Sequence, residues 1–510
     1  MRKRHCFARI AQVQKIINHF LDKYDKETTR ALEILPGTVS WSLILFPIFG
    51  SFWIPHYVAY YAILFNVFWF YKSAALAFTS LLSHFKIKAA QVYDWLSDVK
   101  KIKDWQKVHH LIIIPTYKEP LATIERGLES IATQVYPKER ISICLAMEKR
   151  EKEAKEKGEI LSKKYKNVFA NFIVTSHPDL PGEVKGKSSN QAWAGKIAKK
   201  ILIDQQDLDI DWVTVTSKDA DVVFHPQYLA CLAYNFLTDK NRHLRFWQPA
   251  LVFYNNIWRV PAPVRVINTF CTVWDIALLS RKDKLMNFSI YSAPLKLLDS
   301  VGYWDTDVIP EDYRIFFKTF FANDGKVEVE PIFLPVSADA AESTTYFKTM
   351  INQYEQMKRW AWGTSDDAYV IKNWLRAPFP SFVDKAIRIF RVLADHWLWS
   401  VYWFVLTLGV NLPIFLNPLF AQTVAGRNLP KLSFIILSIC GLFLAVVLYV
   451  DFANRPKRPQ KVSIFRKILS LAEFILMPLT GFFFSALPGI DAHTRLMLGK
   501  YIEYRVTEKV

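Results

Sequence analysis

Residues 38–83 are almost without charge, because Lys72 is the only formally charged side chain in this stretch. A backbone segment that lies in lipid must satisfy its own hydrogen bonds, so an apolar stretch of this kind folds as α-helix. The stretch is longer than the ~20 residues that one span requires, and Pro55 divides it. We therefore expect two transmembrane helices, near residues 38–54 and 56–80.

The second half of the chain contains three more apolar segments, near residues 389–419, 431–454 and 463–490. The sequence R-P-K-R-P-Q-K at 455–461 separates the last two, and its positive charge predicts a cytoplasmic position. We expect two transmembrane helices within 389–454. Prolines and glycines interrupt the last segment, which is therefore either a re-entrant pair of short helices or a fifth transmembrane span.

The segments that flank these apolar stretches are polar. Residues 1–37 have apolar side chains at helical spacing, which indicates a cytosolic or interfacial helix that lies on a membrane surface or packs against the protein. The same residues hold no apolar region of the kind found in cleavable signal peptides. We expect interfacial helices at 84–106 and 346–378, and a cytosolic tail at 491–510.

The chain carries 65 Lys and Arg residues against 47 Asp and Glu residues, a net charge of +18. Such an excess suits nucleic acid, anionic lipid headgroups or anionic substrates such as nucleotide sugars. The sequence shows no module of interleaved basic and aromatic residues, so nucleic acid is not an expected partner. The five cysteines have no C-x-x-C spacing, which argues against a zinc site and a disulfide framework.

Between residues 107 and 345, short apolar runs alternate with polar stretches of helical character. The runs that are short enough to be strands are His110–Pro115, Ile141–Met147 and Phe172–Thr175. This alternation predicts βαβ units and a mostly parallel sheet with helices on both faces. Ligands of such folds gather at the carboxyl ends of the strands.

Asp219 and Asp221 follow the β-branched run Val213–Thr216 (V-T-V-T), which favours a strand. Two carboxylates one residue apart at a strand end can reach one site. They are hard oxygen ligands of the type that Mg²⁺ or Mn²⁺ uses when it also binds substrate phosphates. The same D-x-D pattern also occurs in ordinary solvated turns, so its interpretation depends on the rest of the chain.

The sequence P-T-Y-K-E-P at 115–120 follows the first predicted strand. Tyr117 can pack against a base, and Glu119 can accept hydrogen bonds from a base or a ribose. Glu148, which follows the second predicted strand, has the same potential role. The alternative for each is an ordinary strand-to-helix loop with a carboxylate near the helix start.

Two further motifs lie at predicted helix starts. K-G-K-S-S-N-Q at 185–191 lacks the P-loop pattern, but Lys187 and the helix N-terminus can meet a phosphate, unless this is a basic surface turn. Glu311 and Asp312 begin a helix, and one carboxylate near an acceptor hydroxyl can act as a general base. The alternative is the ordinary preference of helix N-termini for negative charge.

The sequence Q-M-K-R-W places Gln356, Arg359 and Trp360 on one face of a helix. Such a face offers hydrogen-bond donors for pyrophosphate oxygens and an indole ring on which a sugar can stack. An interfacial Trp/Arg helix at a membrane is the alternative.

The order of these motifs over residues 107–363 resembles the membrane-integral family 2 glycosyltransferases, the group that contains the cellulose, chitin and hyaluronan synthases. The resemblance implies a cytosolic α/β domain of the GT-A type, which is Rossmann-like, at residues 107–345 between the transmembrane helices. It also implies inverting transfer of a sugar from a nucleotide-diphosphate sugar with Mg²⁺ or Mn²⁺.

The same resemblance implies a role for each motif. Asp312 matches the general base, with Glu311 beside it, and Asp219 and Asp221 match the metal and diphosphate site. The nucleotide-side positions are Tyr117, Glu119, Glu148, Lys187 and Asp219. The positions for pyrophosphate and acceptor are Gln356, Arg359 and Trp360.

Two departures from the family pattern concern the site. Met147-Glu148 stands where the synthases usually have paired Asp, and Pro310 replaces the common Thr before the acidic pair. We expect an integral protein of the cell membrane, in contact with membrane lipids, with its catalytic domain in the cytoplasm. A polysaccharide synthase with a glycan acceptor is the first hypothesis. Transfer of one sugar to a polyprenyl phosphate or glycolipid is the second, and a membrane scaffold without activity is the third.

Overall fold

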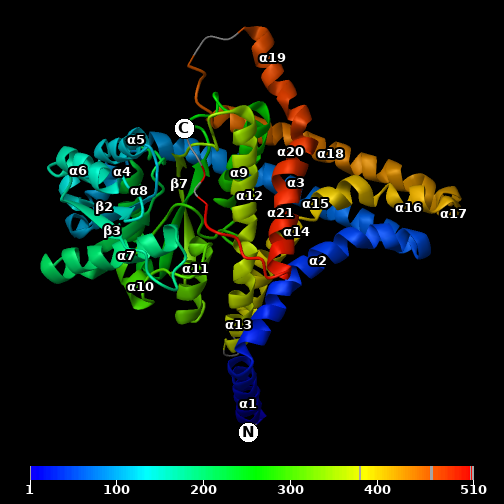
Figure 1. Cartoon of the computed structure of the whole chain (residues 1–510), viewed down its shortest axis with the longest axis horizontal. Coiled ribbons are helices and arrows are strands. Elements are labelled where there is room, and N and C mark those ends of the chain that lie inside the picture. Colours follow the sequence, from blue (N-terminus) through cyan, green and yellow to red (C-terminus); the bar gives the residue numbers. More distant parts are fainter. Residues whose placement is uncertain (1, 378–380, 460–462, 506, 508–510) are drawn as a thin grey trace. The chain divides into compact units, whose positions relative to one another are not determined.

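The computed structural model of the chain describes residues 2–377, 381–459, 463–505 and 507. The chain forms two compact units, whose elements are labelled in Figure 1. The sheet unit comprises residues 82–259, 278–345 and 503–510, and the helical unit comprises residues 1–81, 260–277 and 346–502.

A seven-stranded mixed sheet forms the centre of the sheet unit, with strand order β3-β2-β1-β4-β6-β5-β7. The strands are β1 (His109–Thr116), β2 (Ile141–Glu148), β3 (Asn171–His177), β4 (Val213–Ser217), β5 (Arg245–Val252), β6 (Tyr291–Pro294) and β7 (Glu328–Ser337). Strands β1 to β4 pair in parallel, as the alternating sequence pattern predicts. Their order, 3-2-1-4, is that of the first half of a doubly wound nucleotide-binding sheet. Every residue of β1 and β2 is buried.

Helices cover both faces of this sheet, and Figure 1 shows α5, α6 and α8 on one side and α7, α10 and α11 on the other. Helix α7 contacts β1, β2 and β3, while α6 contacts β2 and β3. Helices of the sheet unit are α4 (Trp95–Val99), α5 (Leu121–Ala132), α6 (Ala154–Tyr165), α7 (Lys187–Lys199), α8 (Tyr228–Thr238), α10 (Leu295–Ser300) and α11 (Glu311–Ala322).

The antiparallel strand β6 determines which loops lie side by side. Ser217, the last residue of β4, is the register partner of Tyr291, the first residue of β6. The loop after β4 therefore adjoins the loop before β6. An isolated bridge between Val223 and Ser337 also brings the end of β7 to the segment that follows the D-x-D motif. Three segments thus converge at the carboxyl end of β4: the loop that follows it, the loop before β6 and the end of β7.

In the helical unit, the described residues form helices and the loops that connect them, and none of these residues belongs to a strand. Its helices are α1 (Arg2–Lys23), α2 (Asp25–Trp53), α3 (Pro55–Val92, which continues into the sheet unit), α9 (Ala262–Leu278), α12 (Tyr346–Ala361), α13 (Asp367–Arg376), α14 (Ser381–Trp399), α15 (Tyr402–Phe404), α16 (Leu412–Leu416), α17 (Pro418–Gln422), α18 (Val424–Asn454), α19 (Ile464–Ala472), α20 (Met477–Gly481) and α21 (Leu487–Met497). The predicted interfacial segment 84–106 is divided between the end of α3 and the short α4.

Among the described residues, four helical segments are long and apolar enough to cross a membrane: Asp25–Trp53, Pro55–Val92, Val424–Asn454 and Ile468–Met497. The first two contain the predicted pair of spans, and the third contains 431–454. Residues 389–419 are divided among α14 to α17 and are not one of the four. The fourth covers most of 463–490, the segment for which the sequence left two alternatives, so the predicted span pattern and the four segments differ at these two places.

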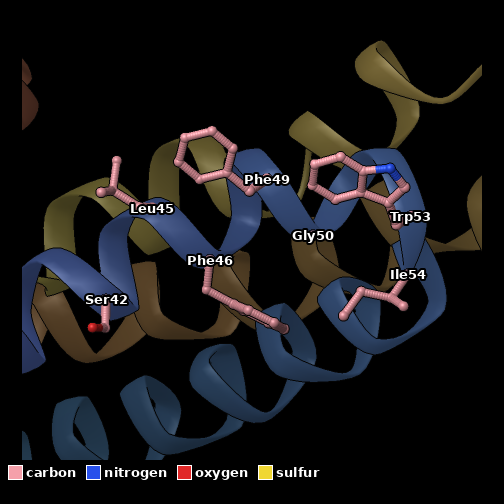
Figure 2. Close-up of a pocket in the computed structure, with 7 residues that line it drawn as sticks. All are labelled: Ser42, Leu45, Phe46, Phe49, Gly50, Trp53 and Ile54. Carbon is pink, nitrogen blue, oxygen red and sulfur yellow. The ribbon is translucent and has the colours of Figure 1, made fainter.

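Apolar side chains are abundant on the outer surface of α2. Figure 2 shows a shallow hollow over this helix, with Leu45, Phe49 and Trp53 along one side and Phe46 on the other. An exposed apolar surface of this kind is expected where a helix faces lipid. The interior of the unit is also apolar, with Ile44, Val401 and Val405 in one of its buried clusters.

Candidate active site

Asp219 lies in the loop after β4 and is held from two directions. Its Oδ1 atom is 2.9 Å from Nζ of Lys187, and its Oδ2 atom accepts a hydrogen bond of 2.7 Å from Oγ of Ser289. Lys187 begins α7 and Ser289 precedes β6, so the strand order brings three distant segments together at this carboxylate.

Asp221 is buried, and its carboxylate points toward the end of β7. Its Oδ2 atom accepts a hydrogen bond of 2.8 Å from the backbone N–H of Asp339. The carboxylate of Asp339 in turn forms an ion pair of 2.6 Å with Arg126 of α5. Sequence reasoning assigned no role to Asp339 or Arg126, because nothing in their local sequence relates them to the D-x-D motif.

Helix α5 passes very close to the D-x-D loop. A Cβ atom at Gly127 would lie 2.3 Å from the backbone oxygen of Ala220 and 2.8 Å from Nζ of Lys218. Lys218 is fully buried beneath the loop, where its Nζ donates to the backbone oxygen of Asp219 at 3.2 Å. Burial lowers the pKa of Lys218 to about 7, although the nearby carboxylates of Asp221 and Asp219 oppose this change. The glycine is therefore required for the packing that supports the loop.

The two carboxylates of the D-x-D motif suit a divalent cation that is shared with a ligand. Mg²⁺ typically binds one or two protein carboxylates together with substrate phosphate oxygens and water. The described residues contain no cluster of three or more His, Cys, Asp or Glu side chains that would hold a metal ion unaided. Asp219 and Asp221 therefore fit a metal ion bound with a diphosphate rather than a cage made only of protein.

Lys187 lies at the centre of an acidic cluster. Besides Asp219, its Nζ atom contacts Oε1 of Glu311 at 3.1 Å and donates to the backbone oxygen of Ser289 at 2.8 Å. Burial disfavours the ammonium form, but Asp219 and Glu311 outweigh this effect and raise the pKa of Lys187 well above its ordinary value. Lys187 is therefore a permanent cation at the site.

Glu311 and Asp312 occupy the first turn of α11, as the sequence predicts. Asp312 accepts hydrogen bonds from two backbone N–H groups, that of Ser289 at 2.8 Å and that of Tyr313 at 2.9 Å. Its carboxylate is thereby fixed in orientation. Glu311 is more deeply buried than Asp312. Its carboxylate contacts the Lys187 ammonium group and so helps to hold that group in place.

Three carboxylates share one ammonium group in this cluster, and this excess of negative charge affects their titration. Burial raises the pKa of Glu311 to about 7, opposed by Lys187 and increased by Asp312. Burial also raises the pKa of Asp312, while Lys187 and the two backbone donors oppose the change. A carboxyl group with a raised pKa is a better proton acceptor near neutral pH than an ordinary carboxylate.

Ser289 is another residue of this site that no sequence motif indicated. Its backbone N–H, hydroxyl and carbonyl contact Asp312, Asp219 and Lys187 respectively. The residue has a φ angle of 56°, a left-handed conformation that is uncommon for residues other than glycine. Such backbone strain is frequent at functional sites. The position of Ser289 at this site follows from the pairing of β6 with β4, which no local sequence pattern indicates.

Three of the predicted nucleotide-side residues, Tyr117, Glu119 and Glu148, lie at the ends of β1 and β2. The carboxylate of Glu119 accepts a hydrogen bond of 2.5 Å from the backbone N–H of Tyr117, so it stabilises its own loop. Glu148 pairs with Arg150, whose guanidinium group lies 3.8 Å from the centre of the Tyr117 ring. Arg150 was not among the residues singled out in the sequence.

The chain end also contributes to the sheet unit. The ring of Tyr504 lies flat against Gly186, since a Cβ atom at this glycine would be 2.7 Å from Cγ of the tyrosine. Gly186 directly precedes Lys187, so the tail covers the loop that carries the central ammonium group. No sequence motif had indicated this contact.

The Q-x-x-R-W motif lies on α12 in the helical unit. Gln356 is buried and its Oε1 accepts a hydrogen bond of 3.2 Å from Gln353, which in turn accepts one from Asn268 of α9. Trp360 packs against the buried cluster that contains Met357. The motif is thus anchored within its own unit, and Arg359 follows one turn after Gln356.

One family model matches the part of the chain that contains three of these motifs. The family model described as Glycosyl transferase family group 2 matches residues 214–450, which include the D-x-D, P-E-D and Q-x-x-R-W motifs. No curated protein matches the chain.

Among solved structures, the chain is similar to two glycosyltransferases. One is the mannosyltransferase PcManGT from Pyrobaculum calidifontis in complex with GDP-Man and Mn²⁺, with 13% identity, coverage of 86% of this chain and 100% of that chain, and a TM-score of 0.41. The other is TarS 1–349 from S. aureus in complex with UDP-GlcNAc, with 16% identity, coverage of 78% and 93%, and a TM-score of 0.35. The part of the chain from residue 214 to residue 450, with three of the motifs, is therefore similar to the glycosyltransferases of family group 2.

Proposed function

We propose that the protein transfers a sugar from a nucleotide-diphosphate sugar to a hydroxyl acceptor at a membrane, with inversion at the anomeric carbon. The observation that carries this proposal is the cluster of Lys187, Asp219, Glu311 and Asp312 around Ser289. A permanent cation and one carboxylate of the D-x-D motif lie in this cluster beside a fixed carboxylate of raised pKa.

Each group has a defined task in this reaction. Asp312 accepts the proton of the acceptor hydroxyl as the hydroxyl oxygen attacks the anomeric carbon. The bond between that carbon and the diphosphate oxygen breaks on the opposite side, which inverts the centre. The leaving diphosphate gains negative charge, and Lys187 stabilises it. Mg²⁺ or Mn²⁺ bound at Asp219 and Asp221 would supply further neutralisation of the diphosphate.

The remaining predicted residues complete the proposal. Tyr117 and Glu148 contact the nucleoside, with Glu119 holding the Tyr117 loop, and Gln356, Arg359 and Trp360 bind the pyrophosphate and the acceptor. The four long apolar helices and the basic segment at 455–461 support an integral membrane protein with this domain in the cytoplasm. We propose a polysaccharide synthase, with transfer of one sugar to a polyprenyl phosphate or glycolipid as the second candidate.

The test is release of nucleoside diphosphate by purified protein in lipid vesicles, over a panel of nucleotide sugars with Mg²⁺ or Mn²⁺. We expect release with one donor, loss of release with EDTA, and loss in Asp221→Asn and Asp312→Asn. NMR of the product anomer tests inversion. A ladder of products supports the synthase, whereas one mass increment on a lipid supports the second candidate. Undiminished release by Asp312→Asn would refute the assignment of the base.

A further inference from the structure

A narrow pocket lies at the carboxyl ends of β2 and β3, next to the loop that leads into α7. Five charged side chains and His177 line it, and each of the six is paired with another. The pairs are Glu148–Arg150, His177–Glu183 and Asp179–Lys185. The lining continues through Val184 to Ser189, so the pocket adjoins Gly186 and Lys187 and therefore the cluster that we assign to the diphosphate.

The Glu148–Arg150 pair is the best-positioned recognition group in this pocket. Glu148 is 5% exposed, and Nε of Arg150 is the atom that contacts its carboxylate. The stacking contact with Tyr117 holds the guanidinium plane from a second side. A guanidinium group has five N–H donors, of which Nε–H is one, so the pair presents acceptor oxygens and donor nitrogens side by side.

The edges of the four common bases differ in how well they match such a pair. Guanine has two adjacent donors, N1–H and the 2-amino group, which suit a carboxylate, and two acceptors, O6 and N7, which suit an arginine. Uracil has one N–H between two carbonyl oxygens, and those oxygens repel a carboxylate. Adenine and cytosine each offer one amino group beside a ring nitrogen acceptor. Guanine alone offers paired donors together with paired acceptors.

We infer that the donor is a guanosine diphosphate sugar, whose base is selected by Glu148 and Arg150. This inference rests on the proposed function, because it names the nucleotide of the proposed donor. Glu148 accepts from the N1–H and 2-amino groups, and Arg150 donates to the acceptor edge. The synthases usually have paired Asp where this chain has Met147-Glu148. On this inference, the difference reflects recognition of another base.

The test measures equilibrium binding by calorimetry of the full-length protein in lipid nanodiscs with Mn²⁺. The probes are GDP, UDP, ADP and CDP, together with IDP, which lacks the 2-amino group, and 7-deaza-GDP, which lacks N7. We expect GDP to bind at least tenfold more tightly than the other three natural diphosphates. IDP and 7-deaza-GDP should each bind about tenfold more weakly than GDP.

Variants assign each contact to its side chain. Glu148→Gln should reduce the difference between GDP and IDP, and Arg150→Lys, which keeps the charge but removes the fork, should reduce the difference between GDP and 7-deaza-GDP. Glu159→Gln and Lys155→Ala are matched controls on the exposed face of α6, where both side chains are mostly accessible. Both controls should retain every preference of the unchanged protein.

The outcomes separate this inference from the proposed function. Tighter binding of UDP, ADP or CDP than of GDP would overturn the guanine assignment and leave the transferase proposal intact. Equal binding of GDP and IDP would overturn the role of Glu148. Binding of none of the diphosphates would overturn the nucleotide-sugar donor itself. Because the nucleotide analogues need no variant, the result does not depend on whether the substituted proteins fold.

Discussion

The Nζ atom of Lys187 lies 2.9 Å from Oδ1 of Asp219, although helix α7 and strand β4 separate these two residues in the chain. The same ammonium group contacts Glu311 from a third segment. These charged groups meet only when the sheet unit is folded, so a change in the charge of one of them should alter the stability of the unit.

Removal of the Lys187 ammonium should destabilise the sheet unit. Lys187→Met leaves buried carboxylates without their cation, which typically costs about 3–5 kcal/mol. Thermal unfolding at pH 8 should show a lower midpoint, and the loss should shrink at pH 5, where Glu311 is protonated. Lys155→Met, on an exposed side chain, is the control. Equal effects of the two variants would contradict the central position of Lys187.

Asp312 and Glu311 should respond differently to conversion to the neutral amide. Asp312→Asn removes the group that we assign as base and should lower the rate of sugar transfer by about 10²–10⁴-fold without a comparable change in nucleotide affinity. Glu311→Gln should have a smaller effect on the rate, because Glu311 contacts Lys187 rather than the acceptor. Steady-state kinetics with calorimetry of nucleotide binding checks this order, and the reverse order would reassign the base.

Glu311 should make stability depend on pH. Its pKa is about 7 in the folded protein, against an ordinary value of 4.5, so the folded state binds this proton more tightly than the unfolded state. The resulting stabilisation is fully present below about pH 4.5 and is lost as the pH rises through 7. It amounts to about 3 kcal/mol. The free energy of unfolding should be measured between pH 5 and pH 8 for Glu311→Gln and for the unchanged protein. It should decrease less steeply with rising pH in the variant, which lacks this carboxyl group.

The stability of the protein should depend on the Ser289 hydroxyl, and glycine should be tolerated better than alanine at this position. Ser289→Ala removes the hydrogen bond to Asp219 and should cost about 1–2 kcal/mol of stability, while donor affinity falls. Ser289→Gly loses the same bond but relieves the left-handed conformation, so it should be the more stable of the two variants. Ranking of both by chemical unfolding tests this, and a more stable alanine variant would exclude backbone strain at this position.

Gly127→Ala should displace the D-x-D loop, because α5 packs closely against this loop at Gly127. The new methyl group would meet the backbone oxygen of Ala220 at 2.3 Å, so the loop or α5 must move. We expect weaker Mn²⁺-dependent nucleotide binding with little change in overall helix content. Titration of Mn²⁺ into the nucleotide complex measures the effect. Gly182→Ala is an unsuitable control because of its positive φ, but Gly441→Ala is suitable, since nothing lies within 4 Å of the added carbon.

The sequence predicted the parallel half of the sheet because its strands consist of short apolar or β-branched runs. It did not indicate the other half. Strand β7 contains Pro331 and Pro335, which usually argue against a strand, and β6 has only four residues. These strands form because they pair with β4 and β5, and the sequence of a single segment does not reveal its pairing partner.

The same difference applies to the candidate site. The proximity of Lys187, Asp219 and Asp312 follows from the rule that ligands gather at strand carboxyl ends, although their roles remain predictions. Ser289 and Asp339 have no motif of their own. They reach the site only because β6 runs antiparallel to β4 and because β7 ends beside the D-x-D segment.

The position of β6 between β4 and β5 also has a consequence for synthesis on the ribosome. The free edge of β4 cannot be covered by β5, which emerges first, but must await residues 291–294. At about 5–20 residues per second, this leaves the V-T-V-T edge unpaired for several seconds, a period in which an open strand edge can associate with other chains. Slow translation between β5 and β6 would extend this interval of exposure.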